Sequence, residues 1–114
     1  MRKIGWIGAG IMGQPMVIHL LNKGYEVHVY ARHPERVEQA KNVGAILEES
    51  IVSLTSNVDV ICTMVGFPSD VKEVYDVIFS CIDAGKTCID FTTSSPKLAK
   101  ELYTKGKELG VHVL

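Results

Sequence analysis

The chain has 114 residues, a formal net charge of −1 and 46% hydrophobic residues. This length suits one domain with a single core, and the near-neutral charge argues against a broad nucleic-acid-binding surface. No apolar run reaches the roughly 18 residues that a membrane-spanning helix needs. We therefore expect a globular, cytoplasmic protein without nucleic-acid or membrane partners.

The cysteines and histidines give no sign of a metal site. Cys62, Cys81 and Cys88 are widely spaced and include no C-x-x-C pair. Cys62 and Cys88 stand in apolar runs, where an unpaired cysteine packs as a small hydrophobic residue. The four histidines lack the spacing of metal ligands. The pattern predicts buried structural thiols and no bound metal.

Strand-like and helix-like segments alternate along the whole chain. Short apolar runs rich in β-branched residues predict strands, and apolar residues three or four positions apart predict helices. The predicted strands are 3–7, 25–30, 45–46, 58–65, 87–91 and 111–114. The predicted helices run from the turn at 8–13 to 23, and over 34–43, 50–56, 68–79 and 96–109. This order predicts an α/β fold with a doubly wound parallel sheet in three layers.

Apolar patterning also predicts which residues are buried. Residues 58–65 form the strongest continuous apolar run, which indicates a central strand buried on both faces. In the first helix, Met12, Met16 and Leu20 fall on one side and predict its buried stripe, which Val17 and Leu21 widen. Leu114 is also expected to be buried. Because the chain then stops inside an element, we expect it to be part of a longer protein.

Residues 8–13 read Gly-Ala-Gly-Ile-Met-Gly, a G-x-G-x-x-G motif. The motif follows a predicted strand and opens a predicted helix, which is the context in which it marks a dinucleotide site. Gly8 would form the tight turn, Gly10 would let the backbone approach a pyrophosphate, and Gly13 would let the helix pack close to the strand. Free N–H groups at the start of the helix would face the phosphates.

The end of the second predicted strand selects between NAD and NADP. An NAD site has an acidic residue there, about 20 residues after the glycines, which binds the ribose 2′-hydroxyl. This sequence has Arg32 at that place and Arg36 one turn further on. A guanidinium suits a 2′-phosphate through bidentate, charge-assisted hydrogen bonds. The pattern favours NADP over NAD, and the alternative interpretation is that both arginines are solvated surface charges.

Three stretches of the chain share motifs with one enzyme family. Residues 4–16 carry the continuation Met-Gly-Gln-Pro-Met after the first two glycines. Residues 90–96 read Asp-Phe-Thr-Thr-Ser-Ser-Pro, and residues 64–66 read Met-Val-Gly. These stretches resemble the opening, the substrate-binding stretch and the Met-Leu-Pro segment of the β-hydroxyacid dehydrogenases, the 3-hydroxyisobutyrate dehydrogenase group. The resemblance covers the whole chain but only the first part of a family member.

The resemblance implies roles for the matching residues. The glycine turn would bind the pyrophosphate, and the basic residues after the second strand would bind the 2′-phosphate. The nicotinamide side and the substrate carboxylate would lie beside residues that follow the later strands. The implied cofactor-binding residues are Gly8, Ala9, Gly10, Ile11, Met12, Gly13, Arg32, His33, Arg36, Met64, Val65, Gly66 and Thr93, and the implied substrate-binding residues are Thr92, Thr93 and Ser94.

The resemblance also implies an activity, which is hydride transfer between NADP and a small β-hydroxy acid or its semialdehyde. A catalytic lysine, the general acid/base, would lie beyond Leu114. We therefore expect residues 1–114 to be a dinucleotide-binding Rossmann domain that lacks the helical C-terminal domain and is inactive alone. The full-length enzyme is expected to be a homo-oligomer. The alternatives are a 6-phosphogluconate dehydrogenase, an imine reductase and, from another class, a non-catalytic dinucleotide-binding sensor.

Overall fold

A single parallel sheet organises the molecule in this computed structural model, which describes residues 2–8, 10–65, 68–91 and 95–114 and only the backbone of residues 10–12, 68 and 69. The sheet has six strands in the order β3-β2-β1-β4-β5-β6, and every pairing is parallel. The strands are β1 Lys3–Ile7, β2 Glu26–Tyr30, β3 Ile46–Leu47, β4 Val60–Thr63, β5 Thr87–Asp90 and β6 His112–Val113. This order confirms the predicted doubly wound Rossmann fold.

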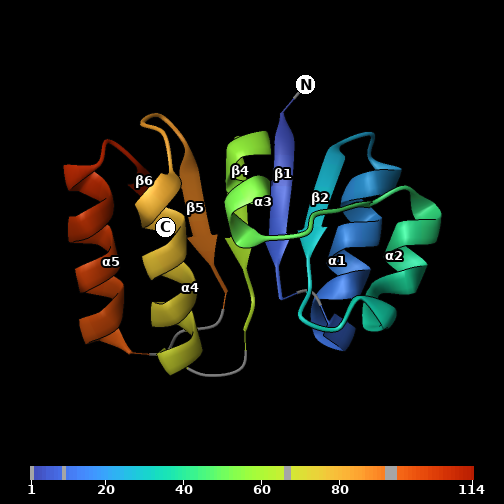
Figure 1. Cartoon of the computed structure of the whole chain (residues 1–114), viewed down its shortest axis with the longest axis horizontal. Helices are drawn as coiled ribbons and strands as arrows, with labels where there is room; N and C mark the ends of the chain where they lie inside the picture. The colour runs from blue at the N-terminus through green and yellow to red at the C-terminus, as the bar shows by residue number, and fades with distance from the viewer. Residues whose placement is uncertain (1, 9, 66–67, 92–94) are drawn as a thin grey trace.

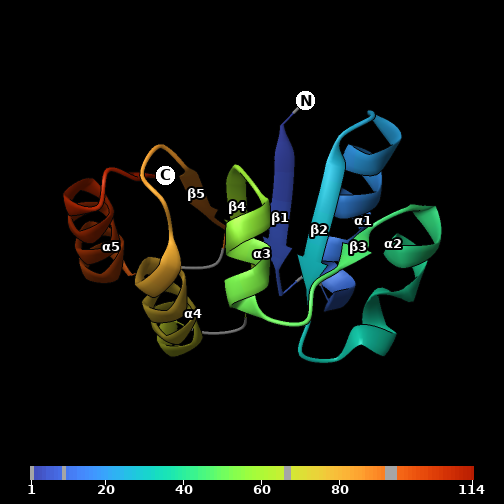
Figure 2. The same ribbon diagram turned by 45° about the horizontal axis from the view of Figure 1, so that its top comes forward.

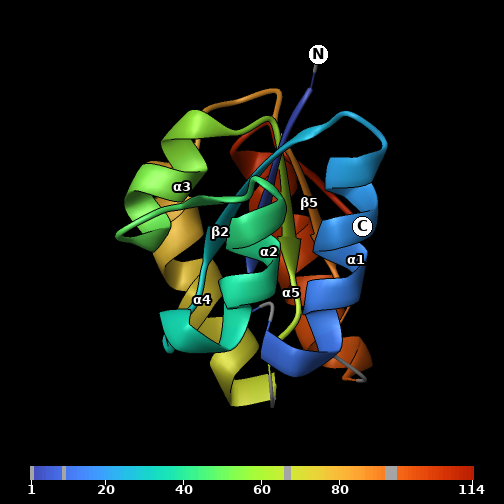
Figure 3. The same cartoon turned by 90° about the vertical axis from the view of Figure 1, so that its right-hand side faces the viewer.

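The helices cover both faces of the sheet, which makes the three predicted layers. They are α1 Gly10–Asn22, the 3₁₀ turn η1 Pro34–Val37, α2 Glu38–Val43, α3 Ile51–Asn57, α4 Pro68–Cys81 and α5 Pro96–Glu108. Helices α1 and α2 lie on one face, and α3, α4 and α5 lie on the other (Figures 1 and 3). Each face has its own core, centred on Trp6 and Val17 on the first side and on Ile61 and Tyr75 on the second.

Local signals in the sequence explain where two helices begin. Ser50 caps α3, because its hydroxyl oxygen accepts a hydrogen bond of 3.0 Å from the backbone N–H of Ser53. Ser95 caps α5 in the same way, accepting from the N–H of Leu98 at 3.3 Å, and Pro96 takes the first helical position as predicted. In the described ranges, every helix is too short or too polar to cross a bilayer.

Three sequence expectations about the elements were wrong in detail. The run 58–65 does supply the central strand, but the strand proper is only Val60–Thr63. The predicted helix 34–43 is divided into η1 and α2. The stripe of α1 that faces the sheet contains the predicted Val17, Leu20 and Leu21 together with Gly13, whereas Met16 is 42% exposed. A glycine carries no hydrophobic signal, so the apolar pattern alone does not reveal Gly13.

Leu114 is a further correction, because 76% of it is exposed. Val113 packs against the core beneath α3, α4 and α5. Side chains alternate along a strand, so Leu114 points to the opposite face. On that face, the helices α1 and α2 pack against the other half of the sheet (Figure 2).

Candidate cofactor site

A cavity of about 460 Å³ opens where the strand order of the sheet reverses. The strand β1 lies between β2 and β4 in the sheet. The helix that follows β1 and the helix that follows β4 therefore cover opposite faces of the sheet, and a crevice forms beyond the carboxyl ends of the two strands. Ligands of open α/β sheets bind at such a crevice. The cavity is lined by Ile7, Gly8, Tyr30, Ala31, Arg32, His33, Arg36, Ile51, Met64, Val65, Asp70, Glu73, Val74 and Val77.

Gly8 begins the glycine turn in a backbone conformation that favours glycine, with φ of 81°. Its N–H donates to the carbonyl oxygen of Tyr30 at 3.1 Å, which ties the turn to the end of β2. A Cβ at this position would collide with the backbone oxygen of Met64 and with the Val65 side chain. The turn can therefore approach Met64 and Val65 this closely only because residue 8 has no side chain.

Gly13 brings α1 close to β1. A Cβ at Gly13 would lie 2.8 Å from Nε1 of the buried Trp6, so any larger residue would press on the indole ring. The Trp6 ring also stacks on Phe91 with 5.6 Å between ring centroids. The third glycine of the motif therefore has a packing role, and the helix starts close to the end of the strand.

The remaining residues of the glycine motif lie at the start of α1. Gly10, Ile11 and Met12 form its first turn, and only their backbone is described. Ala9 lies outside the described residues. In Figure 1, α1 begins at the end of the sheet to which β1 and β2 point. The positive end of a 13-residue helix dipole is thus beside the cavity, an arrangement that favours anions.

A basic wall follows β2. Arg32, His33 and Arg36 all line the cavity and all are exposed to solvent. Arg36 lies in the turn η1, which follows Arg32 and His33. The N–H of Arg36 donates a hydrogen bond of 3.0 Å to the His33 carbonyl, so the chain turns tightly here. Among the implied cofactor residues, this group and Gly8, Met64 and Val65 share one cavity.

The opposite wall comes from the end of β4 and from α4. The N–H of Met64 donates to the carbonyl of Ile7 at 3.0 Å, which places Met64 directly beside the glycine turn. Four α4 residues that the sequence analysis did not single out complete this wall, namely Asp70, Glu73, Val74 and Val77. Their spacing is that of one helix face, but the pattern cannot say whether such a face covers the core or a cavity.

The hydroxyl-rich stretch Thr92, Thr93 and Ser94, and also Gly66, lie outside the described residues. The residues before that stretch are held firmly. Thr63 Oγ1 lies 2.7 Å from Oδ1 of Asp90 and 3.3 Å from the Tyr75 hydroxyl, and the N–H of Phe91 donates to the Thr63 carbonyl at 2.9 Å. Burial raises the pKa of Tyr75, so its hydroxyl stays protonated. These hydrogen bonds therefore fix the position of the carboxyl end of β5 relative to β4 and α4.

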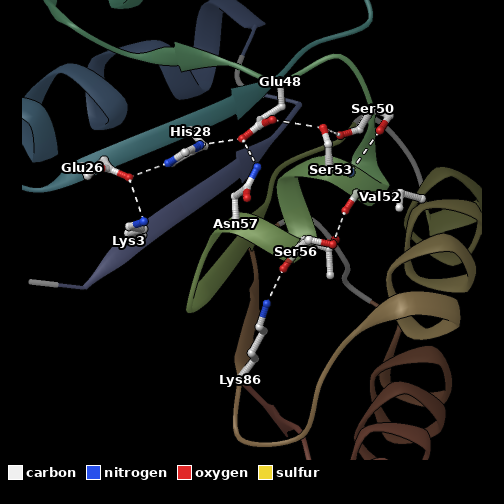
Figure 4. Close-up of polar contacts among 11 residues, drawn as sticks. Lys3, Glu26, His28, Glu48, Ser50, Val52, Ser53, Ser56, Asn57 and Lys86 are labelled. Carbon is white, nitrogen blue, oxygen red and sulfur yellow. Dashed lines mark hydrogen bonds and ion pairs between the residues drawn. The ribbon is translucent and has the colours of Figure 1, made fainter.

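A polar network supports the start of α3, whose first residue lines the cavity (Figure 4). The His28 ring lies 2.6 Å from a Glu48 carboxylate oxygen and 2.7 Å from a Glu26 carboxylate oxygen. The hydrogen bond with His28 lowers the pKa of Glu26. Burial raises the pKa of Glu48, but hydrogen bonds from His28, Asn57 and Ser53 outweigh it, so its pKa is also lowered. These contacts join β2 to the connection between β3 and α3.

Known proteins resemble this chain in sequence. An uncharacterized oxidoreductase of Bacillus subtilis, YkwC, is 43% identical over 116 residues, which are 99% of this chain and 40% of that protein. The 2-hydroxy-3-oxopropionate reductase of Escherichia coli is 35% identical over 95% of this chain and 38% of its own length. The chain thus spans about two fifths of the length of these relatives.

Solved structures show the same fold. The 3-hydroxyisobutyrate dehydrogenase of Mycobacterium tuberculosis, solved with L-serine, has a TM-score of 0.92 at 25% identity over 99% of this chain and 39% of that chain. An imine reductase of Myxococcus stipitatus in complex with NADP⁺ has a TM-score of 0.88 at 26% identity, over 97% of this chain and 39% of its own. A variant of that reductase was solved with NAD⁺ and has a TM-score of 0.89 at 25% identity over 99% of this chain and 39% of that chain.

One protein family matches nearly the whole chain. It is described as the NAD binding domain of 6-phosphogluconate dehydrogenase, and the match runs over residues 3–114. The match includes the glycine turn, the basic wall and the ends of all six strands, so it covers the cavity described above. The chain therefore belongs to this family of nicotinamide-dinucleotide-binding domains.

Proposed function

We propose that this chain binds NADP(H) in preference to NAD(H), as the cofactor domain of an oxidoreductase that acts on a small β-hydroxy acid or its semialdehyde. The observation that carries the cofactor preference is the basic wall of the cavity. Arg32, His33 and Arg36 stand together after β2, and no carboxylate follows β2 before Glu35. A wall of this kind suits a dianionic 2′-phosphate and lacks the side-chain carboxylate that binds a ribose 2′-hydroxyl in NAD sites.

The chain's own residues would divide the binding of the cofactor among them. Backbone N–H groups at the start of α1 would hold the pyrophosphate beside the turn at Gly8, which lines the cavity. Arg32 and Arg36 would bind the 2′-phosphate, and Met64 and Val65 would line the path toward the nicotinamide. The cavity volume of about 460 Å³ is in the range of small-molecule sites.

The bound nicotinamide supplies the hydride chemistry. We assign Thr92, Thr93 and Ser94 to the substrate carboxylate, because they follow the firmly held end of β5 and resemble a substrate-binding stretch. The names of two relatives, 2-hydroxy-3-oxopropionate reductase and 3-hydroxyisobutyrate dehydrogenase of Mus musculus, support a small hydroxy acid or aldehyde as substrate. In proteins of the relatives' length, a lysine beyond Leu114 would act as general acid/base, and oligomerisation would use the part that this chain does not contain.

The test of the cofactor preference is Arg32→Asp. The new carboxylate would repel a 2′-phosphate and could accept from a free 2′-hydroxyl. Losing one charge-assisted hydrogen bond costs about 1.5–3 kcal/mol, or roughly ten- to a hundredfold in affinity for NADPH. Because Arg32 is exposed, we expect the lower end and a dependence on salt. Dissociation constants for NADPH and NADH are measured on both proteins at one ionic strength.

The control for this test is Lys41→Asp, which makes the same change of charge on α2 at an exposed residue that does not line the cavity. It should leave the ratio of the two dissociation constants unchanged. If the unmodified chain binds NADH as tightly as NADPH, the preference for NADP is wrong, whatever the variants do.

Imine reduction is a second candidate, supported by the similarity to the imine reductase structures. The two chemistries are separated by the gene sequence that follows Leu114. A lysine motif there supports a dehydrogenase, and Asp or Tyr in place of the lysine supports an imine reductase. A 6-phosphogluconate dehydrogenase and a non-catalytic sensor stay as alternatives, and the same gene sequence tests them. The cytoplasmic location stays a prediction, since several relatives are named as mitochondrial.

A further inference from the structure

The α4 wall of the cavity is partly apolar and partly acidic, and its acidic part has no role in binding phosphates. Val74 and Val77 line the cavity together with Ile51 of α3, so three branched side chains present an apolar surface. Asp70 and Glu73 line the cavity from the same helix. A carboxylate is a hydrogen-bond acceptor only and repels a phosphate, so this wall must face another part of the ligand.

We propose that Glu73 is a specificity-determining residue that accepts a hydrogen bond from the exocyclic amino group of adenine. This inference rests on the proposed function, in which the cavity holds the adenosine half of the dinucleotide. The basic wall takes the 2′-phosphate, and the ribose links that phosphate to the base. The base then lies on the far side of the cavity, against the apolar surface of Ile51, Val74 and Val77.

The chemistry of the base selects the partner of Glu73. The amino group is the hydrogen-bond donor on the outer edge of adenine, whereas its ring nitrogens are acceptors. A carboxylate at the rim of the apolar surface is complementary to that donor and to none of the acceptors. A base without the amino group would leave the carboxylate without this donor and would be disfavoured.

Glu73 fits this role better than its acidic neighbour on α4. Asp70 stands in the first turn of the helix, where a carboxylate stabilises the helix dipole. Glu73 is one turn further along and exposed, and within the described ranges no hydrogen bond or ion pair engages its carboxylate. Its placement beside the cavity is therefore not explained by a structural partner.

The experiment compares NADPH with reduced nicotinamide purine dinucleotide phosphate, in which a hydrogen atom replaces the amino group of adenine and the ring nitrogens stay acceptors. We expect the unmodified chain to bind NADPH about tenfold more tightly, the value of one charge-assisted hydrogen bond near 1.5 kcal/mol. In Glu73→Gln the charge is lost, and the amide can either accept from the amino group of adenine or donate an N–H to a ring nitrogen of purine. The preference should therefore fall to within about twofold.

Asp76→Asn is the matched control, because Asp76 is exposed on the same helix and lines the separate groove between α4 and α5. It should keep the full preference for adenine. A ratio of dissociation constants cancels any general effect of charge on phosphate binding, since both ligands carry the same phosphates. The proposal is overturned if the unmodified chain binds both ligands equally, or if Glu73→Gln keeps the preference. If neither ligand binds at all, the proposed cofactor site has failed as well.

Discussion

At the scale of single residues, the glycine motif combines two different requirements. Gly8 has a positive φ, lines the cavity and lies too close to the Met64 backbone for a Cβ. Gly13 is helical and buried, and its missing Cβ makes room for the Trp6 ring. The first glycine thus shapes the turn beside the cavity, and the last one packs the helix on the core. We expect substitutions at the two positions to have different effects on the protein.

Gly13→Ala should destabilise the fold, because the new Cβ would lie 2.8 Å from a buried ring that is itself stacked on Phe91. Overpacking of this kind typically costs about 1–3 kcal/mol. The better helix propensity of alanine would return up to about 1 kcal/mol of that. We expect a net loss of about 1–2 kcal/mol in the free energy of unfolding, measured by urea titration. Trp6, the one tryptophan of the sequence, reports the transition by its fluorescence.

Met16→Ala is the control in the same helix, since Met16 is 42% exposed and lies outside the buried stripe. Its effect should stay within about 0.5 kcal/mol, as for surface substitutions in general. An equal loss in both variants would mean that the helix is sensitive along its whole length and that the Trp6 contact is not special.

At the scale of elements, the short helix α3 is tied to the sheet by charges as well as by its apolar face. Leu54 packs in the core, and Ser50 caps the helix. The His28 ring, which is only 6% exposed, lies between the carboxylates of Glu26 and Glu48. The His28 ring therefore joins β2 to the entry of α3.

This network predicts that acid destabilises the protein. The pKa values of Glu26 and Glu48 in the folded state lie below the ordinary 4.5 of an unfolded glutamate. Their contribution to stability is therefore complete above about pH 4.5 and is lost as the pH falls through the lowered values. The free energy of unfolding, measured by urea titration from pH 6 down to pH 3, should fall over the acid part of this range.

The variant His28→Gln tests whether His28 is the cause. It should be less stable at neutral pH by about 1–3 kcal/mol, because a buried hydrogen-bonded group is lost. It should also depend less on pH below 4.5, since the hydrogen bonds with His28 that lower the pKa values of the two carboxyl groups are lost. An unchanged acid slope in this variant would place the origin of the acid sensitivity elsewhere.

At the scale of the whole molecule, the cavity exists because of the order of the strands. The chain leaves β1 toward α1 on one face and leaves β4 toward α4 on the other. The ends of β1, β2 and β4 then meet around one opening, and Figure 1 shows these strands pointing to the same end of the molecule. This opening is the proposed cofactor site, and the chain covers only about two fifths of the relatives named above.

We predict that the 114-residue chain binds NADPH without catalysing dehydrogenation. The proposed lysine lies outside it, and loss of a positioned general acid/base alone costs roughly 10²–10⁴-fold in rate. The measurement follows nicotinamide absorbance with 3-hydroxyisobutyrate and NADP⁺, beside a binding titration on the same preparation. Turnover at the rate of an intact dehydrogenase would contradict the assignment of the catalytic lysine to the absent part.

The sequence by itself determined the order and type of the elements and the position of the glycine turn. Alternating short apolar runs and helical stripes are local patterns, and caps such as Ser50 and Ser95 are local too, so they can be recognised without a fold. Arg32 and Arg36 could also be recognised as candidate phosphate ligands, because this prediction needs only their sequence distance from the glycine motif. The hydroxyl-rich residues 92–94 stay a prediction.

Only the tertiary structure decided which surfaces of these elements meet. The stripe of α1 is set by contact of Gly13 with Trp6, and glycine leaves no mark in a hydrophobic pattern. The α4 wall with Glu73 became part of the site because the helix face next to the core-facing one borders the cavity, and Val74 belongs to both. The pairing of His28 with Glu26 and Glu48 joins β2 to a residue 20 positions away. Contacts of this kind depend on the packing of distant segments, and no local pattern encodes them.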